Sequence, residues 1–321
     1  MTPKNKFRKA FTMLELIFVI VIMGIIGKFG VEFVAQAYSG FINSKINNEL
    51  QSNSATAVEF VASRLQNRIK ASTIAREDNN TFTSLKNYTN TSANILEWVG
   101  SDVDGFRGDS NPYWSGIIDL NNTLTSSSNI SSPETNTTAI ENLIDILSYG
   151  TSGMNDAAIY FVNPDSLDVN WGWDANSSKF DTQIGIDASN QNAIHPIDAN
   201  GISAFKPVNA SSNDNNFTQV IAYEFYQLAW SAYAVGITDW NSTTNSGTLK
   251  LWYDYQPWKG DTYLLQSDGV TATKSEIIME NVSSFRFIAR ESLIKIQVCV
   301  KSLLLIDQGE EYSICKEKTI F

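Results

Sequence analysis

A single carboxylate lies inside the longest apolar run of the chain. Glu15 interrupts the run FTMLELIFVIVIMGIIG, residues 11–27, which is otherwise free of charge. A charge at bilayer depth costs about 2.5–3.5 kcal/mol on insertion scales, so an acid at that depth usually has a partner and a task. Glu15 is therefore the first residue whose type and position predict chemistry, namely a contact between opposite charges inside a membrane.

The run DVDGFRGDS, which starts at Asp102, could hold a hard cation. It places Asp102, Asp104 and Asp109 in one segment, with two glycines between them that allow sharp turns. Calcium favours oxygen-rich loops of this kind, although the spacing does not match an EF-hand loop, which ends in a bidentate Glu. Calcium bound by these three residues is one hypothesis, and an ordinary acidic turn is the alternative in so acidic a protein.

Catalytic chemistry finds little support in the residue types. The only histidine, His195, lies beside Pro196 in a loop-like segment, and we expect it at the surface. Any histidine-based triad would have to use it, yet nothing nearby resembles a nucleophile elbow. The chain also lacks the glycine-rich motifs that bind phosphates. We therefore expect no enzyme.

Four tryptophans could form a platform for sugars. Trp171 and Trp173 flank a glycine, and Trp252 and Trp258 flank the run YDYQP. Aromatic residues at this density more often belong to a core or a subunit interface. The interface interpretation is preferred, and a membrane-anchored module that binds glycans or surfaces is kept as the alternative function.

The N-terminal segment must position Glu15. Residues 1–10 are basic and polar, and the apolar run that follows is close to the roughly 20 residues that a membrane-spanning helix needs. The positive-inside rule places the leader in the cytoplasm and everything after Lys28 across the membrane. A secretory signal peptide fits poorly because the run is long and no small-residue cleavage site follows it directly. A plain signal anchor gives no reason for Glu15.

This segment resembles the type IV pilin superfamily. The match is Ala10, then Phe11 and Thr12, and then Met13, Leu14 and Glu15. The resemblance implies that a prepilin peptidase cleaves between Ala10 and Phe11 and that the new terminal residue is N-methylated. It also implies that Glu15 pairs with the Phe11 amine of a neighbouring pilin or pseudopilin during assembly. The family usually has Gly where this chain has Ala10, which could slow processing.

The chain as a whole predicts an α+β, pilin-like fold. We expect a cleaved leader (1–10), a transmembrane helix segment (11–30), a continuation of that helix (31–75), a loop-rich insertion (76–216) and an antiparallel β-sheet (217–321). Apolar residues spaced by three and four mark the helical face that packs on the head. This face contains Val58, Val61, Ala62, Leu65 and Ile69.

Strand patterns dominate the C-terminal part. Ile294, Ile296, Val298 and Val300 alternate with polar residues, as in a strand with one buried face. The order ENVSSFRF, a turn and IKIQVCV is similar to the C-terminal region of J-type minor pseudopilins and W-type minor pilins. Cys299 and the only other cysteine would meet here across a hairpin.

The two cysteines, Cys299 and Cys315, predict a disulfide if the head is exported, with two free thiols as the alternative. A zinc site would need histidine partners that are absent nearby. The net charge is −11, and loss of the leader would leave 19 basic against 34 acidic residues, a charge of −15. A body this acidic repels phosphate backbones. We therefore expect no nucleic acid among its partners.

These observations favour a minor pseudopilin or pilin of a type II secretion pseudopilus or a type IV pilus. Its expected partners are prepilin peptidase, other pilins or pseudopilins that contact its N-terminal helix, and the inner membrane. The head would then be periplasmic and, after assembly, part of a filament near its tip.

Overall fold

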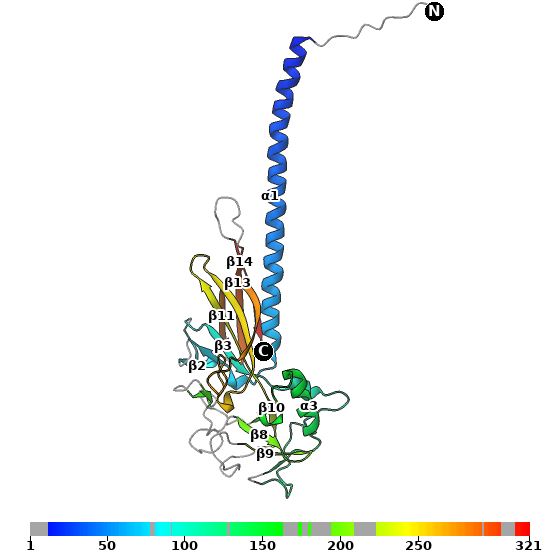
Figure 1. Ribbon diagram of the computed structural model, residues 1–321, viewed down its shortest axis with the longest axis vertical. Helices are drawn as coiled ribbons and strands as arrows, with labels where there is room; N and C mark the ends of the chain where they lie inside the picture. The colour runs from blue at the N-terminus through cyan, green and yellow to red at the C-terminus, as the bar shows by residue number, and fades with distance from the viewer. Residues whose placement is uncertain are drawn as a thin grey trace, which may run out of the picture.

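A long N-terminal helix and a sheet-rich head form the molecule, which therefore has the α+β layout that the sequence predicted (Figure 1). The computed structural model describes residues 12–77, 81–90, 92–126, 129–162, 194–208, 223–290, 292–302 and 312–321. It also describes the backbone of residues 173–174 and 179–180.

Helix α1 (Met13–Gln66) has 54 residues, which at 1.5 Å per residue gives a length of about 81 Å. Its N-terminal part projects away from the head, and only its C-terminal part packs on it (Figure 1). Side chains from Ile46 to Leu65 are buried at intervals of three and four residues, which confirms the predicted apolar face. The helix packs chiefly against strands β14 and β15 of the sheet.

The predicted continuation of the helix to residue 75 is wrong at its end. The helix stops at Gln66, where the backbone N–H of Asn67 donates back to the carbonyls of Arg64 and Leu65. The chain then turns toward the sheet, and the N–H of Ile69 donates to the carbonyl of Val99 over 2.9 Å. Ile69 is still buried, as expected, but as part of this turn.

An eight-stranded antiparallel sheet forms the half of the head next to α1, in the order β15-β14-β13-β12-β11-β3-β1-β2. Five strands come from the C-terminal half, as predicted: β11 (Ala232–Asn241), β12 (Ser246–Tyr255), β13 (Lys274–Arg290), β14 (Leu293–Lys301) and β15 (Ser313–Ile320). Three come from residues that the sequence predicts to lie in the helix and the insertion: β1 (Ile74–Arg76), β2 (Phe82–Ser84) and β3 (Ile95–Val99).

Strand β14 shows why the C-terminal pattern could be predicted. Ile294, Ile296, Val298 and Val300 are buried under α1, whereas Lys295 is exposed. The apolar side chains of one strand face a single packed helix, so alternation in the sequence reports burial directly.

The expected loop-rich insertion contains a second sheet with its own core. Its order is β10-β5-β8-β9-β4, and all of its pairs are antiparallel. Its strands are β4 (Ile130–Ser131), β5 (Ala158–Phe161), β8 (His195–Ala199), β9 (Ala204–Pro207) and β10 (Tyr226–Ala229). The boundary at residue 216 therefore does not separate the two sheets, because β10 follows it in the sequence and pairs with β5.

Short helices complete the head. Helix α3 (Thr137–Ser148) buries Ile140 and Ile144 in the core of the second sheet. The remaining short elements are α2 (Val103–Arg107), η1 (Lys70–Ser72), η2 (Leu85–Asn87), η3 (Met154–Asp156), η4 (Pro257–Lys259) and the strand pair β6 (Trp173–Asp174) and β7 (Lys179–Phe180).

Candidate functional site

Glu15 lies in the first turn of α1, where it forms a capping box with Thr12. The Glu15 carboxylate accepts hydrogen bonds from the backbone N–H and the hydroxyl of Thr12, each over 3.0 Å. The backbone N–H of Glu15 in turn donates to the Thr12 hydroxyl over 3.3 Å. This arrangement starts the helix and fixes the carboxylate at its N-terminus, where the helix dipole favours negative charge. Ala10 and Phe11, the predicted processing residues, lie outside the described residues.

The projecting part of α1 has an apolar surface with no cover from the head. Every large apolar side chain from Met13 to Phe41 is exposed. Between Glu15 and Lys28 there is no charge, and Lys28 then lies 3.9 Å from Glu32 on the helix surface. Among the described residues, α1 is the one helix long and apolar enough to cross a membrane. It is consistent with a single-pass anchor.

Small residues make a shallow hollow on the same helix. Gly27 and Gly30 line it together with Val31, Val34 and Tyr38. Beyond the helix's own adjacent backbone, a Cβ atom added to either glycine would meet nothing within 4 Å, so packing within the chain does not require glycine there. Small residues at such places let a second helix approach closely in a membrane.

The two cysteines are bonded, as predicted. Cys299 on β14 and Cys315 on β15 are direct register partners, with their sulfur atoms 2.03 Å apart. The disulfide joins the last strand to its neighbour at the edge of the sheet, beside α1.

The acidic segment that suggested calcium has a different arrangement. Asp102 is buried at the N-terminus of α2, and its carboxylate accepts hydrogen bonds from the Gly105 N–H and the Trp114 indole, each over 3.1 Å. Burial raises the pKa of Asp102 to about 6, against the effect of these hydrogen bonds. Asp104 and Asp109 are exposed.

The calcium hypothesis gains no support from this arrangement, because Asp102 already has its own donors. Across the part of the chain that the structure describes, no group of three or more His, Cys, Asp or Glu side chains is placed to hold a metal ion.

The surface position expected for His195 is wrong. Its side chain is 3% exposed on β8, and its ring lies 5.1 Å from that of Phe161. Pro196 suggested a loop. In the structure Pro196 pairs with Ala158 of β5, and this pairing places His195 inside the second sheet.

Two of the four tryptophans are core residues. The ring of Trp252 contacts that of Tyr263 edge to face at 5.3 Å, and Trp258 donates from its indole to the Asp156 carbonyl over 2.9 Å. Both are buried, so neither presents a face to a sugar. The side chains of Trp171 and Trp173 lie outside the described residues. Trp252 and Trp258 therefore no longer favour the glycan-binding alternative.

Sequence reasoning missed a buried charged cluster toward the β2 edge of the large sheet. Arg76 of β1 contacts Glu97 of β3 through two guanidinium nitrogens at 2.7 and 2.6 Å, and both side chains are 1% exposed. The Tyr255 hydroxyl donates to the other oxygen of Glu97 over 2.9 Å. Burial and the Glu97 charge raise the pKa of Tyr255 well above 10. Strand patterns flagged neither charge, since a partner is recognisable only once β1 and β3 are paired.

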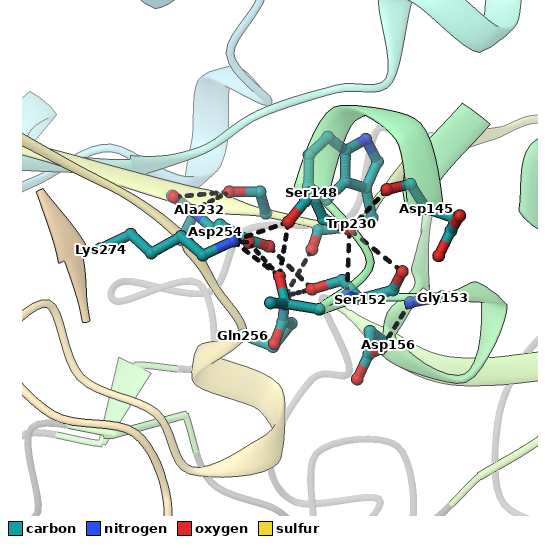
Figure 2. A network of polar contacts seen from close by, with 12 residues as sticks. Asp145, Ser148, Ser152, Gly153, Asp156, Trp230, Ala232, Asp254, Gln256 and Lys274 are labelled. Carbon is teal, nitrogen blue, oxygen red and sulfur yellow. Dashed lines mark hydrogen bonds and ion pairs between the residues drawn. The ribbon is translucent and has the colours of Figure 1, made fainter. Parts of the chain in front are cut away.

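A second polar cluster joins the two sheets (Figure 2). The ammonium group of Lys274 donates to the Asp254 carboxylate over 2.6 Å, to the Ser148 carbonyl over 2.7 Å and to the Thr151 hydroxyl over 2.7 Å. Ser152 donates to the other oxygen of Asp254 over 2.7 Å. Asp254 and Lys274 lie on strands of the large sheet. Ser148 ends α3, and Thr151 and Ser152 follow it, in the part of the chain that packs on the second sheet. This cluster therefore fixes the junction between the two sheets.

Comparison with known proteins adds no relative. Neither a protein-family model, nor a curated protein, nor a solved structure matches this chain.

Proposed function

We propose that this chain is a structural minor subunit, a pseudopilin or pilin, of a type II secretion pseudopilus or a type IV pilus. The observation that carries the proposal is Glu15, a carboxylate held at the start of an exposed apolar helix. Its role is assembly and not catalysis. The pilin-like fold is part of the same proposal and rests on the resemblance at Ala10 to Glu15 together with the α+β layout.

Hydrogen bonds from Thr12 orient the Glu15 carboxylate but do not neutralise it. A cation must supply the rest of the compensation at bilayer depth. Cleavage between Ala10 and Phe11 would create a positively charged amine one residue before Thr12. The amine of one copy can then meet the carboxylate of its neighbour when two helices lie side by side with a small axial offset. This contact converts a membrane anchor into an assembly element.

The exposed surface of α1 supports the same function. In the inner membrane lipid covers it, and in a filament the equivalent helices of other subunits would cover it. Gly27 and Gly30 have open space around them, which permits close approach of a second helix. The basic leader would remain cytoplasmic, and the head would lie in the periplasm. There it is free to contact other minor subunits near the tip of the filament.

The mature N-terminus tests the proposal. Mass spectrometry of the protein purified from its own membrane should find N-methylated Phe11 as the first residue. Deletion of the prepilin peptidase in the same cells should restore the leader. A protein that keeps Met1 in cells with an active peptidase would contradict the proposed processing and, with it, the assembly role of the new amine.

A further inference from the structure

The head contains a cleft of about 420 Å³. Its walls come from the last turns of α1, the turn between β3 and α2, the C-terminus of α3, and strands β12 and β13. Trp230 and Ser231, which precede β11, and Tyr233 on β11 complete its lining. Its size is that of a small-molecule site. The proposed assembly function uses none of these residues.

Aromatic side chains surround this cleft. The five that line it are Phe60, Tyr149, Trp230, Tyr233 and Tyr253. Tyr149 is 88% exposed, so it contributes little to the core. It is also the residue that ends α3 in the left-handed conformation, with φ of 57°. A non-glycine residue there costs about 1 kcal/mol, and glycine would be the usual choice. Neither packing nor the backbone explains a tyrosine at this position, whereas a ligand would.

Charges of both signs complete the walls. The Arg64 guanidinium lies 5.1 Å from the Phe60 ring centre and 5.6 Å from that of Tyr233. Asp104 and Glu276 also line the cleft, as does Asp102, whose carboxylate already accepts from Gly105 and Trp114. Among the residues that the structure describes, Arg64, Asp104 and Glu276 have no ion-pair partner.

The charges and rings of these walls limit which ligands the cleft can bind. The carboxylates disfavour an anion, and the Arg64 guanidinium competes with a cationic ligand for the Phe60 and Tyr233 ring faces, which it already lies over. A purely apolar ligand would strip water from all three charged groups without replacing its hydrogen bonds. A neutral ligand with many hydroxyls and flat C–H faces satisfies both the charged groups and the aromatic rings. We propose that this cleft binds a neutral saccharide, with Tyr149 as a stacking face and Arg64, Asp104 and Glu276 as hydrogen-bond partners.

The test uses the full-length chain in nanodiscs of phosphatidylethanolamine and phosphatidylglycerol, so that no sugar-headed detergent or lipid competes. An array of neutral, acidic and basic oligosaccharides identifies the strongest hit, which is then titrated by calorimetry. Tyr149→Gly should weaken its affinity at least about tenfold. The same variant should melt no lower than the parent, because glycine relieves the left-handed backbone.

Two further variants complete the test. Arg64→Met should also weaken binding about tenfold, while Trp240→Ala, which removes a half-exposed aromatic outside the cleft, should not change it. Three outcomes would overturn the proposal: no binding on the array, binding of charged glycans only, or a neutral hit whose affinity survives Tyr149→Gly. Filament incorporation is measured separately, so loss of binding with normal assembly, or the reverse, tells the two proposals apart.

Discussion

Asp102 should make the stability of the head depend on pH in a direction that is unusual for a carboxylate. Burial raises its pKa from an ordinary 3.8 to about 6. The folded protein therefore holds the proton more tightly than the unfolded chain. The stabilisation is fully present below about pH 4 and is lost as the pH rises through about 6.

The size of the effect follows from the shift. About two pKa units correspond to about 3 kcal/mol in full. At pH 4.5 the unfolded carboxyl is already largely ionised, which leaves about 2 kcal/mol, and at pH 7.5 the contribution is close to zero. For a head of this size, about 2 kcal/mol moves the melting temperature by about 4–8 °C.

Thermal melts of the parent and Asp102→Asn at pH 4.5 and 7.5 measure this. Asparagine offers one acceptor oxygen to the Gly105 and Trp114 donors, so the variant carries a penalty that does not vary with pH. The informative quantity is how the difference in melting temperature between the parent and Asp102→Asn changes from pH 4.5 to pH 7.5. Groups that titrate in the same way in both proteins cancel in this difference. We expect the parent to lose about 4–8 °C relative to the variant between the two pH values. Asp104→Asn is the matched surface control and should follow the parent. A constant difference between parent and Asp102→Asn would refute the reasoning.

Three other perturbations test the interior of the head. Glu97→Ala leaves the buried Arg76 without its ion-pair partner and should lower the free energy of unfolding in urea by about 3–5 kcal/mol. Adding Arg76→Met should restore part of this loss. Equal losses in the single and double variants would argue against the pairing. Reduction of the Cys299–Cys315 bond, which closes a separation of 16 residues, should lower stability by about 3 kcal/mol, and an unchanged melt after verified reduction would contradict this. Asp254→Ala removes an acceptor at the junction of the sheets and should speed hydrogen exchange in the second sheet, so unchanged exchange there would show that the junction does not depend on it.

Sequence patterns predicted the features that depend on residues close together in the chain. The buried face of α1 follows from its spacing of apolar residues, and the buried face of β14 follows from alternation, since each packs against one neighbour. Glu15 could be identified because a charge in an apolar run is conspicuous whatever the tertiary structure. The end of α1 was missed because no proline or glycine marks it. The chain leaves the helix to pair with Gly100, which is distant in the sequence.

Features that depend on distant pairing could not be read in advance. His195 is buried because β8 pairs with β5, and the sequence between these two strands carries no signal for that pairing. Arg76 and Glu97 looked like ordinary polar positions until β1 and β3 became neighbours. The cleft beside Tyr149 is assembled from several separate segments, so no single motif indicates it.

The central claim is that Glu15 makes α1 an assembly element and not only an anchor. Its most direct test compares Glu15→Ala with Glu32→Ala, a matched loss of an exposed acid farther along the same helix. Both variants and the parent should be recovered from the inner membrane in equal amounts. In filaments sheared from the same cells, we expect the parent and Glu32→Ala to be present and Glu15→Ala to be absent. Filaments that contain Glu15→Ala at the level of the parent would contradict the account.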